Sequence, residues 1–285
     1  MENKILGLHH ITAIANNAKI NHDFYTKVLG LRMVKKTVNF DDPNTYHFYY
    51  GNENGAPGTI LTFFPWEGIG KGYTGTGQAT EIGYSVPEGS LDFWANRFKE
   101  NNITIGEKSE RFGEHFLPFQ DPDGLNLSLI VPKQKDNRIV WETNEIKQDT
   151  ATKGFHNITL TLKSIDKTAK ILTDIFGYEL ISQENNRFRF ATNAVENASI
   201  VDLLEEPNGK PGYNAAGTNH HVAFRVPNEE VLMNFREKIL TENLGITPKI
   251  NRDYFFSLYF REPGGVLFEL ATDNPGFTVD EPLAE

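Results

Sequence analysis

The stretch NHHVAFRV at residues 219–226 repeats the pattern of LHHITAI at residues 8–14. In both stretches a pair of histidines stands just inside a run of alternating apolar residues, which is typical of a β-strand with one face in the core. The chain has eight histidines, and these two pairs account for four of them. The repeat therefore indicates a duplicated structural unit that carries a histidine pair in two of its copies.

Four segments share one order of predicted elements, namely a strand, an amphipathic helix and several strands. They begin near Leu8, Ala79, Phe155 and Asn219. In the first and third segments Gly30 and Gly177 follow the helix, where a left-handed cap is expected. The second and fourth end in FQDPDGLNLSLIV and FREPGGVLFELAT, in which Pro and Gly predict a tight turn between two strands. This alternation indicates duplication of a two-module unit.

We therefore predict an α+β fold of four βαβββ modules that form two paired-module domains. The polar and charged stretch KQKDNRIVWETNEIKQDT lies between the second and third segments. It predicts an N-terminal two-module domain at 1–135, a linker at 136–152 and a C-terminal two-module domain at 153–285.

Composition narrows the class of partner. The formal net charge is -10 and no run of Lys or Arg occurs, which argues against nucleic acid and against an anionic membrane. We expect a cytoplasmic protein, because no signal peptide or membrane span is recognisable. The chain has no cysteine, so any bound metal must be held by His, Asp or Glu.

Strand alternation selects three candidate metal ligands. In NHHVAFRV the apolar residues alternate on one face, which places His221 on the other. The same reasoning separates His10 from the apolar side chains of HITAIA, and Glu269 from those of VLFELAT. Three strands thus each present one metal-binding side chain away from the helix layer. An ionised Glu among apolar neighbours needs a compensating cation or donor if it is buried.

Two imidazoles and one carboxylate form a particular kind of metal-ligand set. They occupy one face of a divalent cation and leave up to three positions open for substrate and dioxygen, as in non-haem Fe(II) oxygenases. A single strand histidine is more often a hydrogen-bonded core or rim residue, so the prediction depends on the combination of the three.

These modules, with HHIT and DFYTKVLG, HHVAFRV and REPGGVLFEL, resemble the vicinal oxygen chelate superfamily, which includes glyoxalase I, fosfomycin-resistance proteins and extradiol dioxygenases. The resemblance runs over nearly the whole chain. It implies the same ligands, His10, His221 and Glu269, because the superfamily uses the second His of such a pair and a carboxylate after the Pro-Gly turn.

With HH in the first and fourth modules, the chain looks most like bacterial hydroquinone-type ring-cleaving dioxygenases. That resemblance implies further catalytic residues around the metal, namely His9, Thr12, His220, Arg252 and Tyr259. Strand parity allows Tyr259 to face the site. His9 and His220 have the wrong parity, and they reach the site only if alternation is not yet established at the strand starts; otherwise they cap the sheet edge.

The other modules lack the full ligand set. Glu81 stands where the fourth module has His221, Ser128 where it has Glu269, and Asn157 where the first module has His10. We therefore expect one metal site per chain. The remaining histidines are predicted at the surface or rim: His22, His47, His115 and His156, of which His115 is the candidate pocket residue.

The resemblance implies an Fe(II)-dependent extradiol-type dioxygenase that cleaves the ring of a hydroquinone or catechol with O2, with Mn(II) or another divalent metal as an alternative cofactor. A homodimer is possible. The stretch TILTFFP lacks the carboxylate that glyoxalase-type enzymes use as a fourth ligand. The run Phe63–Trp66 is either an aromatic substrate wall or simple core. The alternative functions are a glyoxalase-like isomerase or thiol transferase, and a non-catalytic protein that binds a small molecule such as an antibiotic.

Overall fold

The computed structural model describes residues 4–40 and 42–282, and it contains the four predicted βαβββ modules. The first module comprises β1 (Leu8–Ala15), α1 (Ala18–Asp23) with a following π-helical turn (Phe24–Val28), β2 (Arg32–Asn39), β3 (Asp42–Gly51) and β4 (Ile60–Pro65). The second comprises β5 (Gln78–Ser85), α2 (Leu91–Glu100), β6 (Ser109–Arg111), β7 (Glu114–Gln120) and β8 (Asn126–Ile130).

The third and fourth modules repeat this order. The third comprises β9 (Gly154–Leu162), α3 (Asp166–Lys170) with a π-helical turn (Ile171–Ile175), β10 (Glu179–Glu184), β11 (Arg187–Ala191) and β12 (Ile200–Glu205). The fourth comprises β13 (Thr218–Val226), α4 (Glu229–Thr241), β14 (Ile250–Asn251), β15 (Phe255–Arg261) and β16 (Leu267–Pro275), followed by a 3₁₀ turn (Phe277–Val279). The predicted fold class is confirmed.

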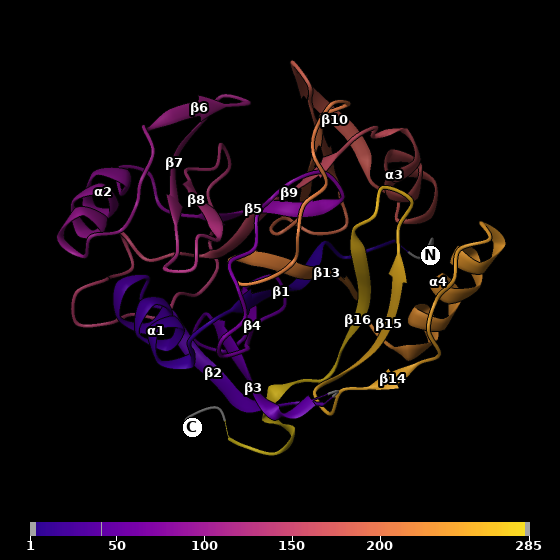
Figure 1. The fold of residues 1–285 in the computed structure, drawn as a ribbon, viewed down its shortest axis with the longest axis horizontal. Coiled ribbons are helices and arrows are strands. Elements are labelled where there is room, and N and C mark those ends of the chain that lie inside the picture. The colour runs from indigo at the N-terminus through magenta and orange to yellow at the C-terminus, as the bar shows by residue number, and fades with distance from the viewer. Residues whose placement is uncertain (1–3, 41, 283–285) are drawn as a thin grey trace.

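The modules form two curled eight-stranded sheets, which occupy the lower and upper parts of Figure 1. The first sheet has the order β14-β15-β16-β13-β1-β4-β3-β2, and the second has the order β10-β11-β12-β9-β5-β8-β7-β6. Modules one and four therefore share a sheet, as do modules two and three. Each sheet takes strands from both sides of the predicted linker at 136–152. The predicted domains at 1–135 and 153–285 therefore do not correspond to the two sheets, and the division into domains stays a prediction.

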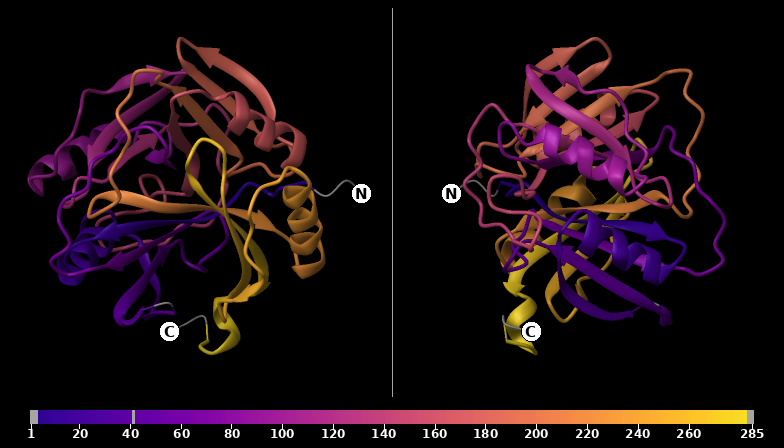
Figure 2. Two further views of the ribbon diagram at one scale, coloured as in Figure 1. Left: turned by 45° about the vertical axis from the view of Figure 1, so that its right-hand side comes forward. Right: turned by 90° about the vertical axis from the view of Figure 1, so that its left-hand side faces the viewer.

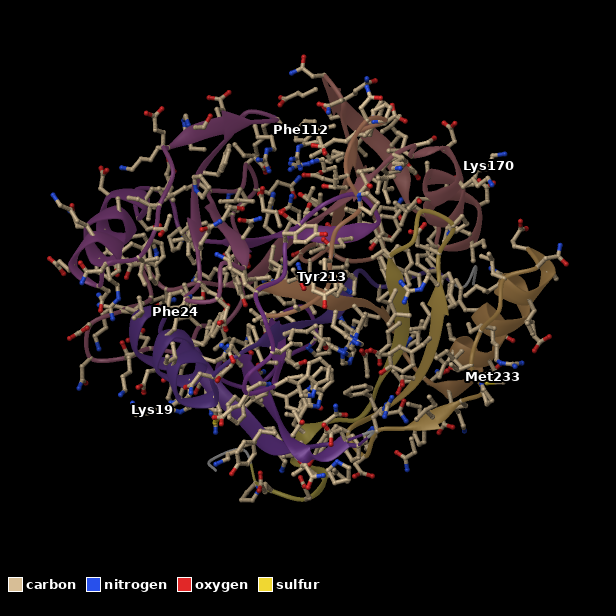
Figure 3. The ribbon with its side chains drawn as sticks, viewed as in Figure 1. Lys19, Phe24, Phe112, Lys170, Tyr213 and Met233 are labelled. Carbon is tan, nitrogen blue, oxygen red and sulfur yellow. The ribbon has the colours of Figure 1, made fainter. Side chains whose placement is uncertain are left out.

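Two long loops carry the chain between the sheets. The loop from β4 to β5 leads into the second sheet, and the loop from β12 to β13 leads back. They are bridged to each other at Lys71 with Ala216 and at Tyr73 with Tyr213. Tyr213 lies near the middle of the face shown in Figure 3.

The helices lie on the outer side of the curled sheets, as Figure 2 shows. Leu232, Phe235 and Ile239 of α4 are fully buried, so this helix is amphipathic, as predicted for each segment. Gly30 and Gly177 have φ of 71° and 77°, so both glycines adopt the predicted left-handed conformation after a helix. The inner faces of the sheets are thereby left to polar side chains. No helix in the described part of the chain is long and apolar enough to cross a bilayer.

Candidate metal centre

Three side chains from three adjacent strands converge on the inner face of the first sheet. His221 Nε2 lies 2.9 Å from Glu269 Oε2, and His10 Nε2 lies 3.2 Å from the same oxygen. The two Nε2 atoms are 3.4 Å apart. All three side chains are buried, and Glu269 has no exposed surface. Among the described residues, this is the one group of three or more such side chains whose candidate ligand atoms come this close together.

The geometry fits a divalent cation. Ligand atoms roughly 2.1 Å from one ion are about 3.0 Å apart at right angles and about 3.4 Å apart at tetrahedral angles. The three distances lie in or next to this range. Neither oxygen of Glu269 accepts a well-formed hydrogen bond from the described residues, although both are buried. A buried carboxylate without donors is costly unless a cation faces it, so the donor set indicates a metal site.

Bulges in the β1·β13 ladder place consecutive histidines on one side. On β1, Leu8 and His10 pair with consecutive residues of β13, so His9 is an extra residue without a partner. On β13, His221 and Asn219 pair with consecutive residues of β1, so His220 is extra in the same way. A residue that a bulge inserts into a strand breaks the inward-outward alternation. The simple parity assigned to His9 and His220 from the sequence is therefore wrong, for a reason that lies in the ladder rather than at the strand starts.

Each inserted histidine contacts its neighbour through Nδ1. His9 Nδ1 lies 2.9 Å from His10 Nδ1, and His220 Nδ1 lies 2.8 Å from His221 Nδ1. In each pair one nitrogen must donate and the other accept. If the Nδ1 atoms of His10 and His221 carry the proton, their Nε2 lone pairs are free to bind a metal. Such outer partners fix the tautomer and ring orientation of ligating histidines.

Burial and charge set the protonation states. Burial and the neighbouring His10 together lower the pKa of His9 to about 3. Burial also lowers the pKa of His221. Burial alone would raise the pKa of Glu269, but the imidazoles of His10 and His221 outweigh it and hold that pKa below its usual range. The carboxylate of Glu269 is therefore ionised, which is the form that binds a cation.

The other expected residues surround this centre. Tyr259 is the β15 register partner of Glu269, and its ring meets the His221 ring edge-on at 5.5 Å. Burial raises its pKa well above the usual value, so the phenol keeps its proton. The Arg252 guanidinium lies 5.3 Å from the Tyr259 ring centroid. Thr12 pairs with His221 in the ladder, and its hydroxyl contacts the Thr62 hydroxyl at 2.8 Å.

Sequence reasoning missed His47. It was expected at the surface or rim, but it is buried in β3. Its Nε2 lies 2.9 Å from the Thr62 hydroxyl, and its Nδ1 lies 2.8 Å from the Tyr49 hydroxyl. A polar chain therefore runs from Tyr49 through His47 and Thr62 to Thr12. The alternation of His47 and Tyr49 in YHFYY was a usable signal, because it places both side chains on one face of β3.

The aromatic run at 63–66 is divided between two roles. Phe63 is buried against Tyr25, with ring centroids 4.6 Å apart, and is core. Phe64 lies 4.5 Å from the His47 ring and 5.7 Å from the His220 ring. Trp66 stacks on Phe64 at 5.5 Å. Phe64 and Trp66 are therefore the members that flank the histidines.

The segment after β16 covers part of the same inner region. Phe277 stacks on Tyr254 at 5.2 Å and meets Tyr49 at 5.3 Å. Lys35 of β2 forms ion pairs with Asp280, at 2.8 Å, and with Glu281. These contacts join the two ends of the curled first sheet. Sequence reasoning did not predict them, because they link residues that are distant along the chain.

The corresponding positions of the second sheet hold no ligand set. Glu81 pairs with Arg111 at 2.9 Å and accepts a hydrogen bond from Ser128 at 3.0 Å. Asn157 donates to Asp202 at 2.7 Å. His156, expected at the surface, is instead buried against Glu114 at 2.9 Å.

The two remaining histidines match the expectation. His22 and His115 have side chains that are 41% and 73% exposed, respectively.

The chain matches the model of the Glyoxalase/Bleomycin resistance protein/Dioxygenase superfamily over residues 7–129 and 154–270. It belongs to this superfamily. It is 45% identical, over 99% of its length and 89% of the relative, to MhqO of Bacillus subtilis (strain 168), which carries the provisional name of a ring-cleaving dioxygenase. It is 34% identical, over 98% of its length and 88% of the relative, to a chlorohydroquinone/hydroquinone 1,2-dioxygenase of Sphingobium indicum.

Solved structures show the same fold. A crystal structure of a provisionally named dioxygenase from Bacillus subtilis matches with a TM-score of 0.94 at 44% identity, covering 99% of this chain and 89% of that one. Glyoxalase I from Zea mays matches with a TM-score of 0.70 at 14% identity, covering 94% and 92% of the two chains, which shows the shared fold alone.

Proposed function

We propose that the protein is an Fe(II)-dependent ring-cleaving dioxygenase that acts on a hydroquinone or catechol. The observation that carries this proposal is the buried group of two imidazoles and one carboxylate, whose candidate ligand atoms all lie within 4.8 Å of one another. Such a set leaves neighbouring coordination positions open. The relative named a hydroquinone dioxygenase supports the same substrate class.

The alternative isomerase chemistry is less well supported. Glyoxalase-type enzymes add a fourth protein ligand from the last strand of the first module. Here that strand is β4, which lies next to β1 and presents Thr62 opposite Thr12. Thr62 is engaged with Thr12 and His47 through its hydroxyl. An open three-ligand site favours binding of both an organic substrate and dioxygen.

Iron(II) held by His10, His221 and Glu269 would supply adjacent positions for a phenolate oxygen and for dioxygen. The chain would orient the substrate and handle its protons. Phe64 and Trp66 provide flat apolar surface for an aromatic ring beside His220. We assign His220 the role of accepting the phenol proton, because its ring lies beside Phe64 and its Nδ1 contacts His221. Tyr259 keeps its proton and can donate a hydrogen bond to an oxyanion.

The test begins with loading of the protein with Fe(II) under anaerobic conditions. Oxygen uptake is then recorded as methylhydroquinone, catechol and chlorinated hydroquinones are added in turn. We expect one O2 consumed per ring-opened product with at least one of these substrates. Ser128→Ala is the matched control, because Ser128 occupies the position of Glu269 in the second sheet and lies outside the metal centre.

Absence of oxygen uptake by protein with one bound iron per chain would overturn the proposal. Conversion of a hemithioacetal by the same protein, without oxygen uptake, would assign it to the isomerase class instead.

A further inference from the structure

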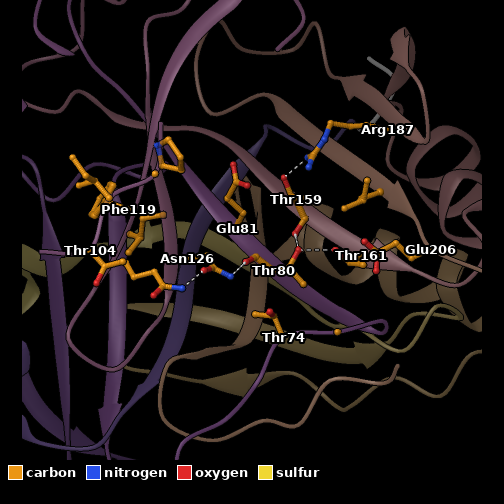
Figure 4. Close-up of a pocket in the computed structure, with 17 residues that line it drawn as sticks. Thr74, Thr80, Glu81, Thr104, Phe119, Asn126, Thr159, Thr161, Arg187 and Glu206 are labelled. Carbon is orange, nitrogen blue, oxygen red and sulfur yellow. Dashed lines mark hydrogen bonds between the residues drawn. The ribbon is translucent and has the colours of Figure 1, made fainter. Parts of the chain in front are cut away.

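The inner face of the second sheet contains a cavity of about 470 Å³ whose lining includes none of the candidate metal ligands. Figure 4 shows side chains that line it, including Glu81, Phe119, Asn126, Thr159 and Arg187. Its volume lies in the range of small-molecule sites, which is roughly 300 to 1,000 Å³. The second sheet and the loops beside it therefore form an open cavity with room for a compound of modest size.

Three arginines approach this inner face, and they differ in how well they are paired. Arg189 donates to both oxygens of Asp202, at 2.8 and 3.0 Å, and to Glu114 at 2.5 Å. Arg111 pairs with Glu81 at 2.9 Å and stacks on the Phe116 ring. Both guanidinium groups thus have an anionic partner at hydrogen-bond distance.

Arg187 is different. Among the described residues its guanidinium donates one hydrogen bond, to the neutral Thr159 hydroxyl at 2.8 Å, and the Asp202 carboxylate lies 3.9 Å away. The charge of Glu81 also acts on Arg187, without a hydrogen bond between the two side chains. Its side chain is only 12% exposed. Burial, together with the nearby Arg111, lowers its pKa. A guanidinium has five N–H donors in a planar fork that suits a carboxylate, so most of its donors face the cavity without a protein acceptor.

The rest of the lining limits the charge and shape of a ligand. Glu81, which pairs with Arg111, and Glu206 line the cavity together with Arg187, so the local charge allows one ligand carboxylate on Arg187 and disfavours a second. Ile105, Pro118 and Phe119 form an apolar part of the wall. A ligand with a single negative charge and an apolar body fits both the charge and the apolar wall. Inorganic phosphate carries more than one charge near neutral pH and has no apolar part, so it fits neither.

We propose that this cavity is a binding site for a small organic monocarboxylate with an aromatic or similar apolar body. The carboxylate accepts hydrogen bonds from Arg187 and lies beside the Thr159 hydroxyl, while the ring contacts Pro118 and Phe119. The site is separate from the metal centre and goes beyond the proposed dioxygenase activity, because it needs neither iron nor oxygen.

The test is a titration of the full chain with 4-fluorobenzoate, followed by the line width and shift of the fluorine resonance. We expect saturable binding by the wild-type protein, and at least tenfold weaker binding of 4-fluorobenzamide, which keeps the ring but lacks the charge. Arg187→Gln should weaken 4-fluorobenzoate binding by at least tenfold, and Arg187→Lys by less. Arg261→Gln removes an arginine side chain exposed on β15 and should leave the affinity unchanged.

Two further variants locate the site and guard against misfolding. Glu269→Ala should retain 4-fluorobenzoate binding, since the carboxylate does not bind at the metal centre. Ile105→Glu changes an exposed residue at the cavity, so the protein should fold normally and lose affinity by charge repulsion. Equal binding by wild type, Arg187→Gln and Ile105→Glu would overturn the proposal, as would absence of binding or loss of binding in Glu269→Ala.

Discussion

The inner faces of the two sheets share one backbone register but hold different chemistry. On the first sheet Thr12 pairs with His221, and Ala223 with both His10 and Glu269. On the second sheet Thr159 pairs with Glu81, and Gly83 with both Asn157 and Ser128. The inserted residues match as well, since His156 and Thr80 are skipped in the β5·β9 ladder as His9 and His220 are in the β1·β13 ladder.

The difference lies in how the polar groups are satisfied. On the first sheet the candidate ligand atoms of His10, His221 and Glu269 converge on one point, which fits a bound cation. On the second sheet Glu81 and Asp202 are already held by arginines and by amide or hydroxyl donors. The comparison teaches that the bulged ladder is a scaffold that positions side chains, and that only their identity decides between a metal centre and an ion-pair network.

The largest effect is expected at Glu269. Glu269→Ala removes the anionic ligand, so we expect loss of stoichiometric metal binding, measured by metal analysis after gel filtration. The fold should persist, because the ligands lie on the inner face rather than in the core beneath the helices. Ser128→Ala should retain full metal content. Cooperative loss of structure in Glu269→Ala, His10→Ala and His221→Ala alike would mean that the three residues are structural.

A smaller effect on metal affinity is expected from His9. His9→Ala removes the group that contacts His10 Nδ1, and loss of such outer partners typically weakens metal binding by about 10- to 100-fold. Competition with a chelator measures the change. His156→Ala is the matched control at the equivalent bulge of the second sheet, and unchanged metal affinity is expected there. Similar weakening in both variants would show a general effect on folding instead.

The second sheet should carry a pH-dependent contribution to stability. Burial alone would raise the pKa of Glu114, but His156 and Arg189 hold it at about 2. Because the folded pKa lies below the ordinary value of 4.5, this contribution is complete above about pH 4.5 and is lost as the pH falls towards 2. Urea unfolding of Glu114→Gln should show a loss on the order of 2 kcal/mol at pH 7. An unchanged difference from wild type between pH 7 and pH 3 would contradict this.

The smallest effect tests packing at one equivalent position. A Cβ on Gly83 would lie 2.0 Å from Asn157 Oδ1 and 2.6 Å from Ile130 Cδ1. Gly83→Ala should therefore destabilise the protein by about 1 kcal/mol through overpacking, with no change in metal affinity. Thermal unfolding of the loaded and metal-free protein measures both. A stabilising effect would mean that Asn157 is free to move.

Local sequence patterns predicted much of this structure. Alternation and glycine positions predicted the four modules, and strand parity selected His10, His221 and Glu269, because both are properties of a few consecutive residues. The pairing of β1 with β13 was beyond such patterns, since it joins segments more than two hundred residues apart. The same local sequence patterns would arise if modules one and two shared a sheet. They therefore could not reveal that module one shares its sheet with module four.

The bulges were likewise invisible in the sequence. HHIT and NHHV read as ordinary alternating strands, and the insertion of His9 or His220 is defined only against the partner strand. The alternation of His47 with Tyr49 was visible, but the burial of His47 was not, because it depends on β4 and on the aromatic side chains of Tyr49 and Phe64. Strand parity therefore selected three side chains that do converge, His10, His221 and Glu269, whereas it misplaced His9 and His220 beside them.

The nesting of the modules has a consequence for how the protein is made. Synthesis proceeds from the N-terminus, and domains fold as they emerge. The second sheet is contiguous in sequence, from β5 to β12, so its strands can pair before β13 leaves the ribosome. Until β13 is made, the edge of β1 that pairs with it stays open. An open strand edge can pair with other chains. The candidate metal centre is complete only when β16 joins, so any metal would be captured after nearly all of these residues have been translated.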